Sequence, residues 1–284
     1  MRALSNLFGI FLILSLSGYS FGDTVPVWPA DQKVILVILE NTSYSEAIKA
    51  PFLSQLAKGG ALMTEYHAIG HPSEPNYVAL IAGDTLGVNA DDQYDLDSTS
   101  IADLLEAQGK TWRVYAEGFP GNCFTGMTSG EYARKHVPFM SFKNISTDSK
   151  RCANIMNSTN FTTDFTSGNL ANYNMFIPNL NDDGHDTNVT YADTYMNKLF
   201  APLIANQAAM ANVLIIVTFD EDDSVIGGTN QVYAAFYGPS VKPGTQVSTN
   251  YSHYNILRTI EDGFGLGNLG RNDAKATDLT GFWQ

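Results

Sequence analysis

The sequence predicts an α/β fold, a three-layer sandwich in which helices cover both faces of a mostly parallel central sheet. Two continuous apolar runs, Val34–Leu39 and Val213–Phe219, suit strands that are buried on both sides. Segments with helical spacing alternate with strands along the chain, which is typical of a parallel sheet. The 284 residues are 44% hydrophobic, which is enough for one large core.

Apolar residues at helical spacing, interrupted by glycines and prolines, divide the first half of the chain. There we expect helices at 45–58, which Pro51 divides in two, at 76–82 and at 100–108, and a strand at 111–116. In the second half we expect strands at 175–178, 213–219 and 231–237, and helices at 191–211 and 253–264.

The stretch from Pro120 to about Asn172 shows no clear period and is rich in Asn, Ser, Thr, Gly and Phe. We interpret it as an ordered, irregular insertion near the functional site, because aromatic residues occur throughout it. It contains Cys123 and Cys152, which we expect to form one disulfide in an oxidising compartment rather than two buried thiols. Since no repeat or low-complexity linker occurs, we expect one domain over residues 23–284.

Residues 1–22 have the pattern of a secretory signal peptide. Arg2 precedes the apolar run Leu7–Leu14, and the small residues Ser20 and Gly22 precede Asp23. The run is short for a bilayer span, which favours cleavage over anchoring. We expect an exported protein, extracellular or periplasmic, without stable membrane insertion. Acceptor sequences for N-glycosylation agree with export and occur at Asn144, Asn157, Asn160, Asn188, Asn250 and, formally, Asn41.

Composition excludes several classes of partner. Lys and Arg total 16 against 29 Asp and Glu, a formal net charge of −13. A generic nucleic-acid binder, or a protein that adheres to anionic membranes through a basic face, needs the opposite sign. Two cysteines are too few for a disulfide-rich scaffold or a Cys-rich zinc module.

Oxygen-bearing side chains follow three of the expected strands. Glu40-Asn41 comes after the first buried strand, Asn179–Asp186 after the short strand at 175–178, and Asp220–Asp223 after the second buried run. Each group alone is compatible with a solvated turn. Because the carboxyl ends of parallel strands meet at one edge, we expect the three groups to lie together, where a cation would relieve their repulsion.

The segment His71–Tyr77 leads into the expected helix at 76–82. Ser73 takes an N-cap position there, with Pro75 in the first turn, and a capping serine needs no other role. The same place at a helix N-terminus suits a serine that attacks a bound phosphate, and Asn76 is placed to donate its amide N–H to a phosphate oxygen.

Two histidines lie near these groups. His185 has acidic neighbours and His253 begins the last helix, so both are candidate proton donors or metal ligands. Lys135 and His136 form one of the few positive spots, which contacts an anionic substrate or is simply solvated.

Taken in order, these motifs resemble the secreted acid phosphatase and phospholipase C phosphoesterases of the alkaline phosphatase superfamily. The motifs that carry the resemblance are Leu39–Tyr44, His71–Tyr77, Asn179 with His185-Asp186, Thr218–Glu221 and Tyr251–Tyr254. The resemblance implies an alkaline phosphatase-like fold and a metal-dependent phosphatase that passes through a phosphoserine.

The resemblance also implies a role for individual residues. The implied catalytic residues are Ser73 as nucleophile, Asn76 as stabiliser of the transferring phosphoryl group, and His185 and His253 as phosphate contacts or proton donors. The implied metal ligands are Glu40, Asn41, Ser73, Asp220 and Glu221. The expected substrate contacts are His71, Lys135 and His136. As a ligand, Asn41 would not carry a glycan.

Two-zinc members of the superfamily carry a histidine directly after the strand-end aspartate, where this chain has Glu221. That difference favours a single hard, calcium-like cation over a zinc pair. A second metal site stays open as an alternative, built from Asp182 or Asp183 with His185 and His253.

The expected function is that of a secreted acid phosphatase acting on small phosphomonoesters. A phospholipase C-type phosphodiesterase with the same core is the nearest alternative. A more distant one is a non-enzymatic, secreted calcium-binding protein in which Ser73 only caps a helix. A sulfatase fits less well, because the Cys/Ser-x-Pro-x-Arg motif of those enzymes does not occur here.

Overall fold

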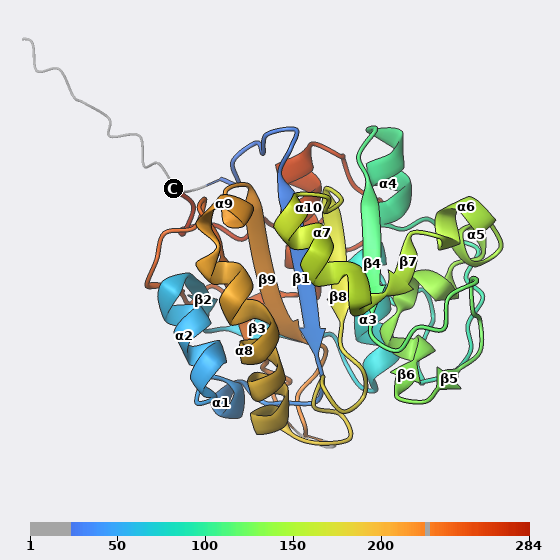
Figure 1. The fold of residues 1–284 in the computed structure, drawn as a ribbon, viewed down its shortest axis with the longest axis horizontal. Helices are drawn as coiled ribbons and strands as arrows, with labels where there is room; N and C mark the ends of the chain where they lie inside the picture. Colours follow the sequence, from blue (N-terminus) through green and yellow to red (C-terminus); the bar gives the residue numbers. More distant parts are fainter. Residues whose placement is uncertain (1–23, 225–227) are drawn as a thin grey trace, which may run out of the picture.

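The computed structural model describes residues 24–224 and 228–284 (Figure 1). The expected signal peptide lies outside the described residues. An eight-stranded sheet runs through the centre in the order β11-β2-β10-β9-β1-β8-β4-β7. Its strands are β1 Lys33–Leu39, β2 Ala61–Met63, β4 Trp112–Ala116, β7 Ile155–Asn157, β8 Tyr173–Ile177, β9 Val213–Phe219, β10 Ala234–Tyr237 and β11 Thr245–Val247.

The sheet is mostly parallel, as expected. β1 pairs in parallel with β8 and β9, and β4 pairs in parallel with β7 and β8. Among the described strands of this sheet, β10 alone runs against its neighbours, β9 and β2. Val34–Leu39 and all of β9 are buried, which explains why both segments are continuously apolar.

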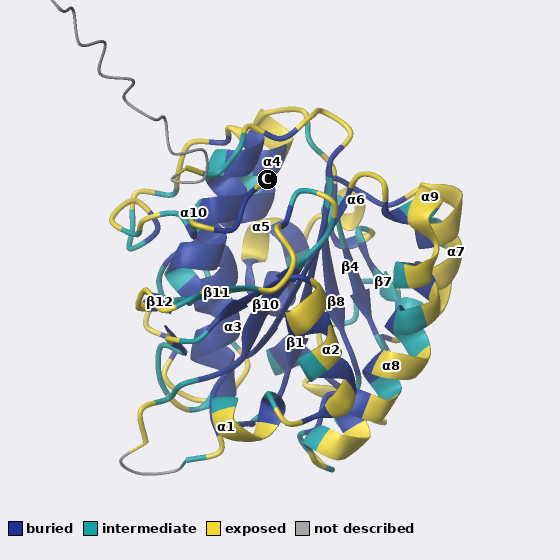
Figure 2. Ribbon diagram, turned by 90° about the vertical axis from the view of Figure 1, so that its left-hand side faces the viewer, coloured by how far each residue is buried: buried dark blue, intermediate teal, exposed yellow. Residues whose placement is uncertain are grey.

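Helices cover both faces of the sheet and complete the three layers (Figures 1 and 2). α2, α7 and α8 lie on one face, and α3 and α10 lie on the other. The helices are α1 Tyr44–Ala47, α2 Pro51–Gly59, α3 Ser73–Ala82, α4 Ile101–Ala107, α5 Lys143–Ser146, α6 Ser149–Cys152, α7 Phe161–Ser167, α8 Val189–Ala205, α9 Gln207–Met210 and α10 His253–Phe264. Among the described residues, no helix combines the length and the apolar character that a membrane crossing needs.

The stretch at 120–172 is more regular than expected. It contains the hairpin β5 Thr128–Ser129 with β6 Tyr132–Ala133, the helices α5 to α7, and three short 3-10 helices, η1 Arg134–His136, η2 Pro138–Ser141 and η3 Ser158–Asn160. It also supplies β7, the edge strand of the central sheet. Elements of two to seven residues are too short to show a hydrophobic period, so the sequence pattern missed them. The disulfide between Cys123 and Cys152 is present.

Other differences concern short elements and boundaries. The helix expected at 191–211 is two helices, because the Asn206 side chain accepts from the backbone N–H of Ala209 and begins α9. The strand expected from Gln231 begins at Ala234. The sequence pattern missed β2 and β11, and also the small pair of β3 Tyr66–His67 and β12 Tyr251–Ser252.

A buried carboxyl group on α10 makes the stability of the fold depend on pH. Glu261 is completely buried, and neither of its carboxylate oxygens has a hydrogen-bond partner among the described residues. Burial, supported by the negative charge of Asp273, raises the pKa of Glu261 from 4.5 to about 9. Between these two values the folded chain binds a proton that the unfolded chain has released, so the free energy of unfolding falls as pH rises.

We expect the variant Glu261→Gln to lose this dependence, because the amide stays neutral at every pH. Its stability relative to the wild type should rise by up to about 1.4 kcal/mol per pH unit between about pH 5 and pH 9. Urea unfolding of both proteins at three pH values measures this difference. The exposed Glu46→Gln is the control and should leave the slope unchanged. A difference between Glu261→Gln and the wild type that stays constant with pH contradicts the expectation.

Candidate active site

The register of two central strands sets the position of the first site residues. Leu39 at the end of β1 pairs with Phe219 at the end of β9, so Glu40 and Asp220 follow side by side. The backbone N–H of Asp220 donates to the carbonyl of Leu39, at 3.0 Å. The acidic residues therefore meet at one edge of the sheet, as the sequence predicts.

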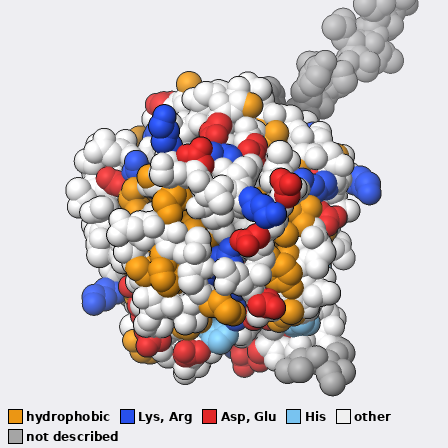
Figure 3. Space-filling model, turned by 90° about the vertical axis from the view of Figure 1, so that its right-hand side faces the viewer, with side chains coloured by type: hydrophobic (Ala, Val, Ile, Leu, Met, Phe, Trp, Pro, Cys, Tyr) orange, Lys and Arg blue, Asp and Glu red, His pale blue; other side chains and the backbone are white. Residues whose placement is uncertain are grey.

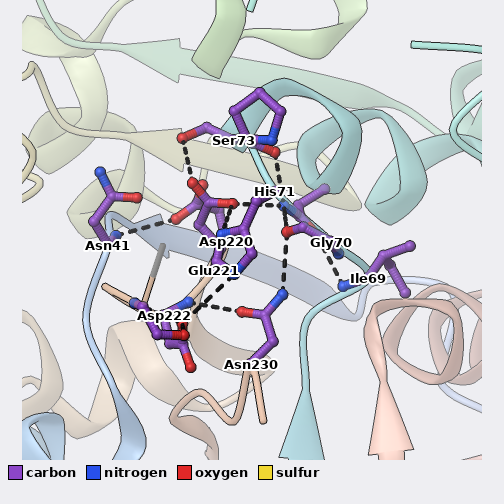
Figure 4. A network of polar contacts seen from close by, with 12 residues as sticks. Asn41, Ile69, Gly70, His71, Ser73, Asp220, Glu221, Asp222 and Asn230 are labelled. Atoms are coloured by element: carbon purple, nitrogen blue, oxygen red, sulfur yellow. Dashed lines mark hydrogen bonds and ion pairs between the residues drawn. The ribbon is translucent and has the colours of Figure 1, made fainter. Parts of the chain in front are cut away.

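Ser73 lies against these carboxylates (Figure 4). Its Oγ donates to Glu40 Oε2 at 3.0 Å and lies 3.3 Å from Glu221 Oε1. It is the first residue of α3 rather than its N-cap, which is Pro72, and its hydroxyl caps no backbone N–H. The hydroxyl therefore does not have the helix-capping role that was the alternative to a nucleophile. Ser73 is 2% exposed, so the nucleophile candidate is almost completely covered.

The carboxylates around Ser73 are crowded and buried. Burial, together with the charges of Asp220 and Asp183, raises the pKa of Glu40 well above its usual range. Burial also raises the pKa of Asp220 to about 7 and that of Glu221 to about 8. Burial disfavours the charged form of all three carboxylates, and a positive charge among them would favour their ionised form.

The chemistry of this group fits a hard cation. Asp220 Oδ2 is buried and has no hydrogen-bond partner in the part of the chain that the structure describes, while Oδ1 accepts from the backbone N–H of Asn41 at 3.2 Å. The expected ligands Glu40, Asn41, Ser73, Asp220 and Glu221 offer only oxygen donors, which calcium and magnesium prefer. As the side chains stand, no group of three or more His, Cys, Asp or Glu residues in the described ranges encloses a position for a metal ion.

Asn76 has a different contact set from the expected one. It is completely buried, and its Oδ1 accepts from the backbone N–H groups of Ile69 and Gly70 at 2.9 and 3.1 Å. Its Nδ2 donates to the carbonyls of Gly70 and Pro72 at 2.8 and 3.1 Å. With both ends of the amide engaged, Asn76 holds the loop that precedes Ser73. Its Nδ2 also lies 3.4 Å from Glu221 Oε2, beside the carboxylate group, and its expected contact with a phosphoryl oxygen stays a prediction.

His253 is also placed differently from its expected role. It is completely buried, its Nε2 lies 2.6 Å from the carbonyl oxygen of Asp220, and its Nδ1 lies 2.9 Å from Tyr66 Oη. Burial lowers the pKa of His253 to about 4. The buried ring contacts the backbone of Asp220, which suits a positioning role, and the proton transfer expected of His253 stays a prediction.

His136, expected to contact substrate, points inward. It is 1% exposed, with Nε2 at 3.1 Å from Glu40 Oε1 and Nδ1 at 3.1 Å from Asp183 Oδ2. Its ring stacks on the ring of Tyr77, and the two ring centroids are 5.0 Å apart. Burial, supported by the charge of Lys135, lowers the pKa of His136 well below its usual range. The buried ring lies between these two carboxylates rather than at the surface.

Three of the expected residues stay accessible. The His71 side chain is 37% exposed, and its Nδ1 lies 2.7 Å from Glu221 Oε2. The His185 side chain is 29% exposed, and its Nδ1 lies 2.7 Å from Asp186 Oδ1. The other ring nitrogen of His185, Nε2, lies 3.3 Å from Lys135 Nζ. Accessible histidine and lysine side chains thus border the covered carboxylate group.

Two residues that the sequence reasoning missed complete the site. Tyr77 Oη donates to Glu40 Oε1 at 2.6 Å. Tyr77 is four residues after Ser73 on α3, and that spacing places both on one helix face. Asp91 accepts from the backbone N–H of Glu74 at 2.9 Å and from Lys135 Nζ at 2.7 Å. No local pattern marks Asp91, because it lies in an irregular segment between α3 and α4.

The chain is similar to known phosphatases. The sequence model of the Phosphoesterase family matches residues 40–267. A probable acid phosphatase of Kluyveromyces lactis is 36% identical over 262 residues, which cover 88% of this chain but only 62% of the relative. A phosphatidylinositol-3-phosphatase of Mycobacterium tuberculosis is 37% identical over 261 residues, covering 89% of this chain and 84% of the relative.

The fold has counterparts among solved structures. A protein in the alkaline phosphatase superfamily from Vibrio parahaemolyticus superposes with a TM-score of 0.59 at 14% identity, covering 88% of this chain and 71% of that one. This likeness confirms the fold expected from the resemblance. On the match to residues 40–267, the chain belongs to the phosphoesterase family.

Proposed function

We propose that the protein is an exported, metal-dependent acid phosphatase that hydrolyses small phosphomonoesters through a phosphoserine at Ser73. One observation carries the proposal: the Ser73 hydroxyl lies at the start of α3, within 3.3 Å of Glu40 and Glu221, in a buried carboxylate group. The relatives' names support a monoesterase, since both are phosphatases. They also favour an enzyme over a calcium-binding protein without activity.

Glu40, Asn41, Ser73, Asp220 and Glu221 are the residues that would hold the cation. When bound, a hard cation neutralises phosphate charge and favours the ionised serine hydroxyl. Tyr77 fixes Glu40 for this role through its hydroxyl, and His253 fixes the backbone at Asp220. The amide of Asn76 fixes the loop before the nucleophile.

The reaction then divides into two transfers. Ser73 Oγ attacks phosphorus in line, the ester P–O bond breaks, and His185 gives a proton to the departing alcohol oxygen. Water next attacks the phosphoserine and gives a proton to His185, the Ser73 Oγ–P bond breaks, and the ionised Ser73 hydroxyl and inorganic phosphate are released. His185 is assigned this role over His253 because its side chain is 29% exposed, whereas His253 is completely buried.

The substrate range tests the proposal against the phosphodiesterase alternative. Ser73 is almost covered, so a phosphoryl group with one substituent fits more easily than one with two. We expect kcat/KM for p-nitrophenyl phosphate to exceed that for bis(p-nitrophenyl) phosphate by at least about 100-fold, roughly 3 kcal/mol in transition-state free energy. Cleavage of the diester or of phosphatidylcholine at an equal or greater rate would show a phospholipase C-type enzyme instead.

A further inference from the structure

We propose that a cavity of about 180 Å³ beside His185 binds the alcohol part of the substrate and selects aryl or other compact apolar leaving groups. The cavity lies between the β5–β6 hairpin, η1 and the loop that follows β8. Residues that line it and carry the argument are Asp91, Met127, Ala133, Lys135, Leu180 and His185. The inference rests on the proposed function and names the substrate class for the same site.

One end of the cavity is charged and is tied to the nucleophile. Asp91 Oδ1 accepts from the backbone N–H of Glu74, directly after Ser73, and its Oδ2 holds Lys135 Nζ at 2.7 Å. Lys135 Nζ in turn lies 3.3 Å from His185 Nε2. An ammonium group offers only donors, so in this contact Lys135 donates to His185 Nε2, and the two side chains line the charged end of the cavity, which favours an anionic phosphoryl group there. The carbon skeleton on that oxygen then extends into the cavity.

The other end is apolar. Met127 is 50% exposed, although large hydrophobic side chains of the described residues rarely remain so exposed. Leu180 and Ala133 line the cavity with it. Figure 3 shows the face that carries β5 and β6, on which hydrophobic side chains lie between charged ones. A flexible, polarisable methionine at the mouth of an apolar hollow suits contact with a ring or a short chain.

The volume limits what the cavity accepts. Its 180 Å³ is close to the roughly 150 Å³ of an apolar protein cavity that holds benzene. One ring or a short branched chain therefore fits, whereas a pair of acyl chains does not. A larger, polar cavity also reaches His185. Its lining includes Asn41, Glu46, Lys49 and Asp223 but not Asp91 or Lys135, the two residues that tie the smaller cavity to α3. The structure thus favours an apolar leaving group over a polyol.

The test compares phenyl phosphate with glycerol phosphate in the full chain and in Met127→Gln, which keeps the size of the side chain but makes it polar. We expect kcat/KM for phenyl phosphate to fall roughly three- to tenfold, mainly through KM, and that for glycerol phosphate to change less than about twofold. The matched control is Val27→Gln at an exposed apolar residue outside the cavity, which should change neither. Inhibition constants give a second readout that needs no turnover. The wild type should bind phenylphosphonate more tightly than methylphosphonate, and Met127→Gln should reduce that preference.

Equal losses for both substrates, or no loss for phenyl phosphate in Met127→Gln, would overturn the subsite while leaving the phosphatase intact. A preference of the wild type for glycerol phosphate that Met127→Gln leaves unchanged would assign the leaving group to the polar cavity. Failure of the wild type to hydrolyse either ester would overturn the subsite together with the proposed function.

Discussion

Replacing Ser73 by alanine is expected to lower kcat/KM for p-nitrophenyl phosphate by roughly 10³- to 10⁶-fold, the range seen when a catalytic serine is removed. The physical reason is that no other hydroxyl in the described structure lies between Glu40 and Glu221 as the Ser73 hydroxyl does. Without it, no covalent intermediate forms at this position. Steady-state kinetics of purified wild type and Ser73→Ala under one set of conditions give the ratio.

Two controls separate loss of the nucleophile from loss of the fold. Ser73→Ala makes a small change in a helix whose backbone it does not cap, so circular dichroism and the unfolding midpoint should stay close to those of the wild type. Ser73→Thr retains a hydroxyl and should keep measurable turnover. A folded Ser73→Ala protein with a near-normal rate would contradict the mechanism and favour the calcium-binding alternative.

Removal of divalent cations should have the second largest effect. We expect dialysis against a chelator to lower kcat by at least about 100-fold, because charge stabilisation by a catalytic metal contributes several kcal/mol. Calcium or magnesium should restore activity better than zinc, since the expected ligands carry oxygen only. Assay after dialysis and after titration with each ion measures both effects.

Metal content gives a readout that does not depend on turnover. Elemental analysis and calorimetric titration should show one equivalent of calcium or magnesium bound to the wild type and none to Asp220→Asn, which keeps the shape of the side chain and removes its charge. Two tightly bound zinc ions would instead support the two-metal alternative with Asp182 or Asp183, His185 and His253. Full activity in metal-free protein would contradict a metal-dependent enzyme.

The sequence was most informative about residues that come directly after a buried strand, because the strand determines their position. Continuous apolar runs identified β1 and β9. Parallel strands end at the same edge of the sheet, so Glu40 and Asp220, which follow these two strands, could be predicted as neighbours. The position of Ser73 next to them followed from its motif and the family resemblance. For Glu40 and Asp220, the register of the two strands alone fixes the relative position.

Burial and hydrogen-bond partners could not be predicted from residue type. His253, His136 and Asn76 have polar side chains of the kind that catalysts use, yet all three are buried, and the polar atoms of His253 and Asn76 are engaged in contacts inside the protein. Their partners come from segments far apart in the sequence. Asp91 could not be predicted either, because its contacts with α3 and with Lys135 form only when the chain folds.

The most direct test of the central claim is to trap the covalent intermediate. Wild-type protein mixed with excess substrate is quenched in acid within the first turnovers and digested, and the peptide that contains Ser73 is analysed by mass spectrometry. We expect one phosphate on Ser73, released with time as product forms, and none in Ser73→Ala. An active enzyme that never carries phosphate on this peptide, or that carries it on another residue, would contradict the account.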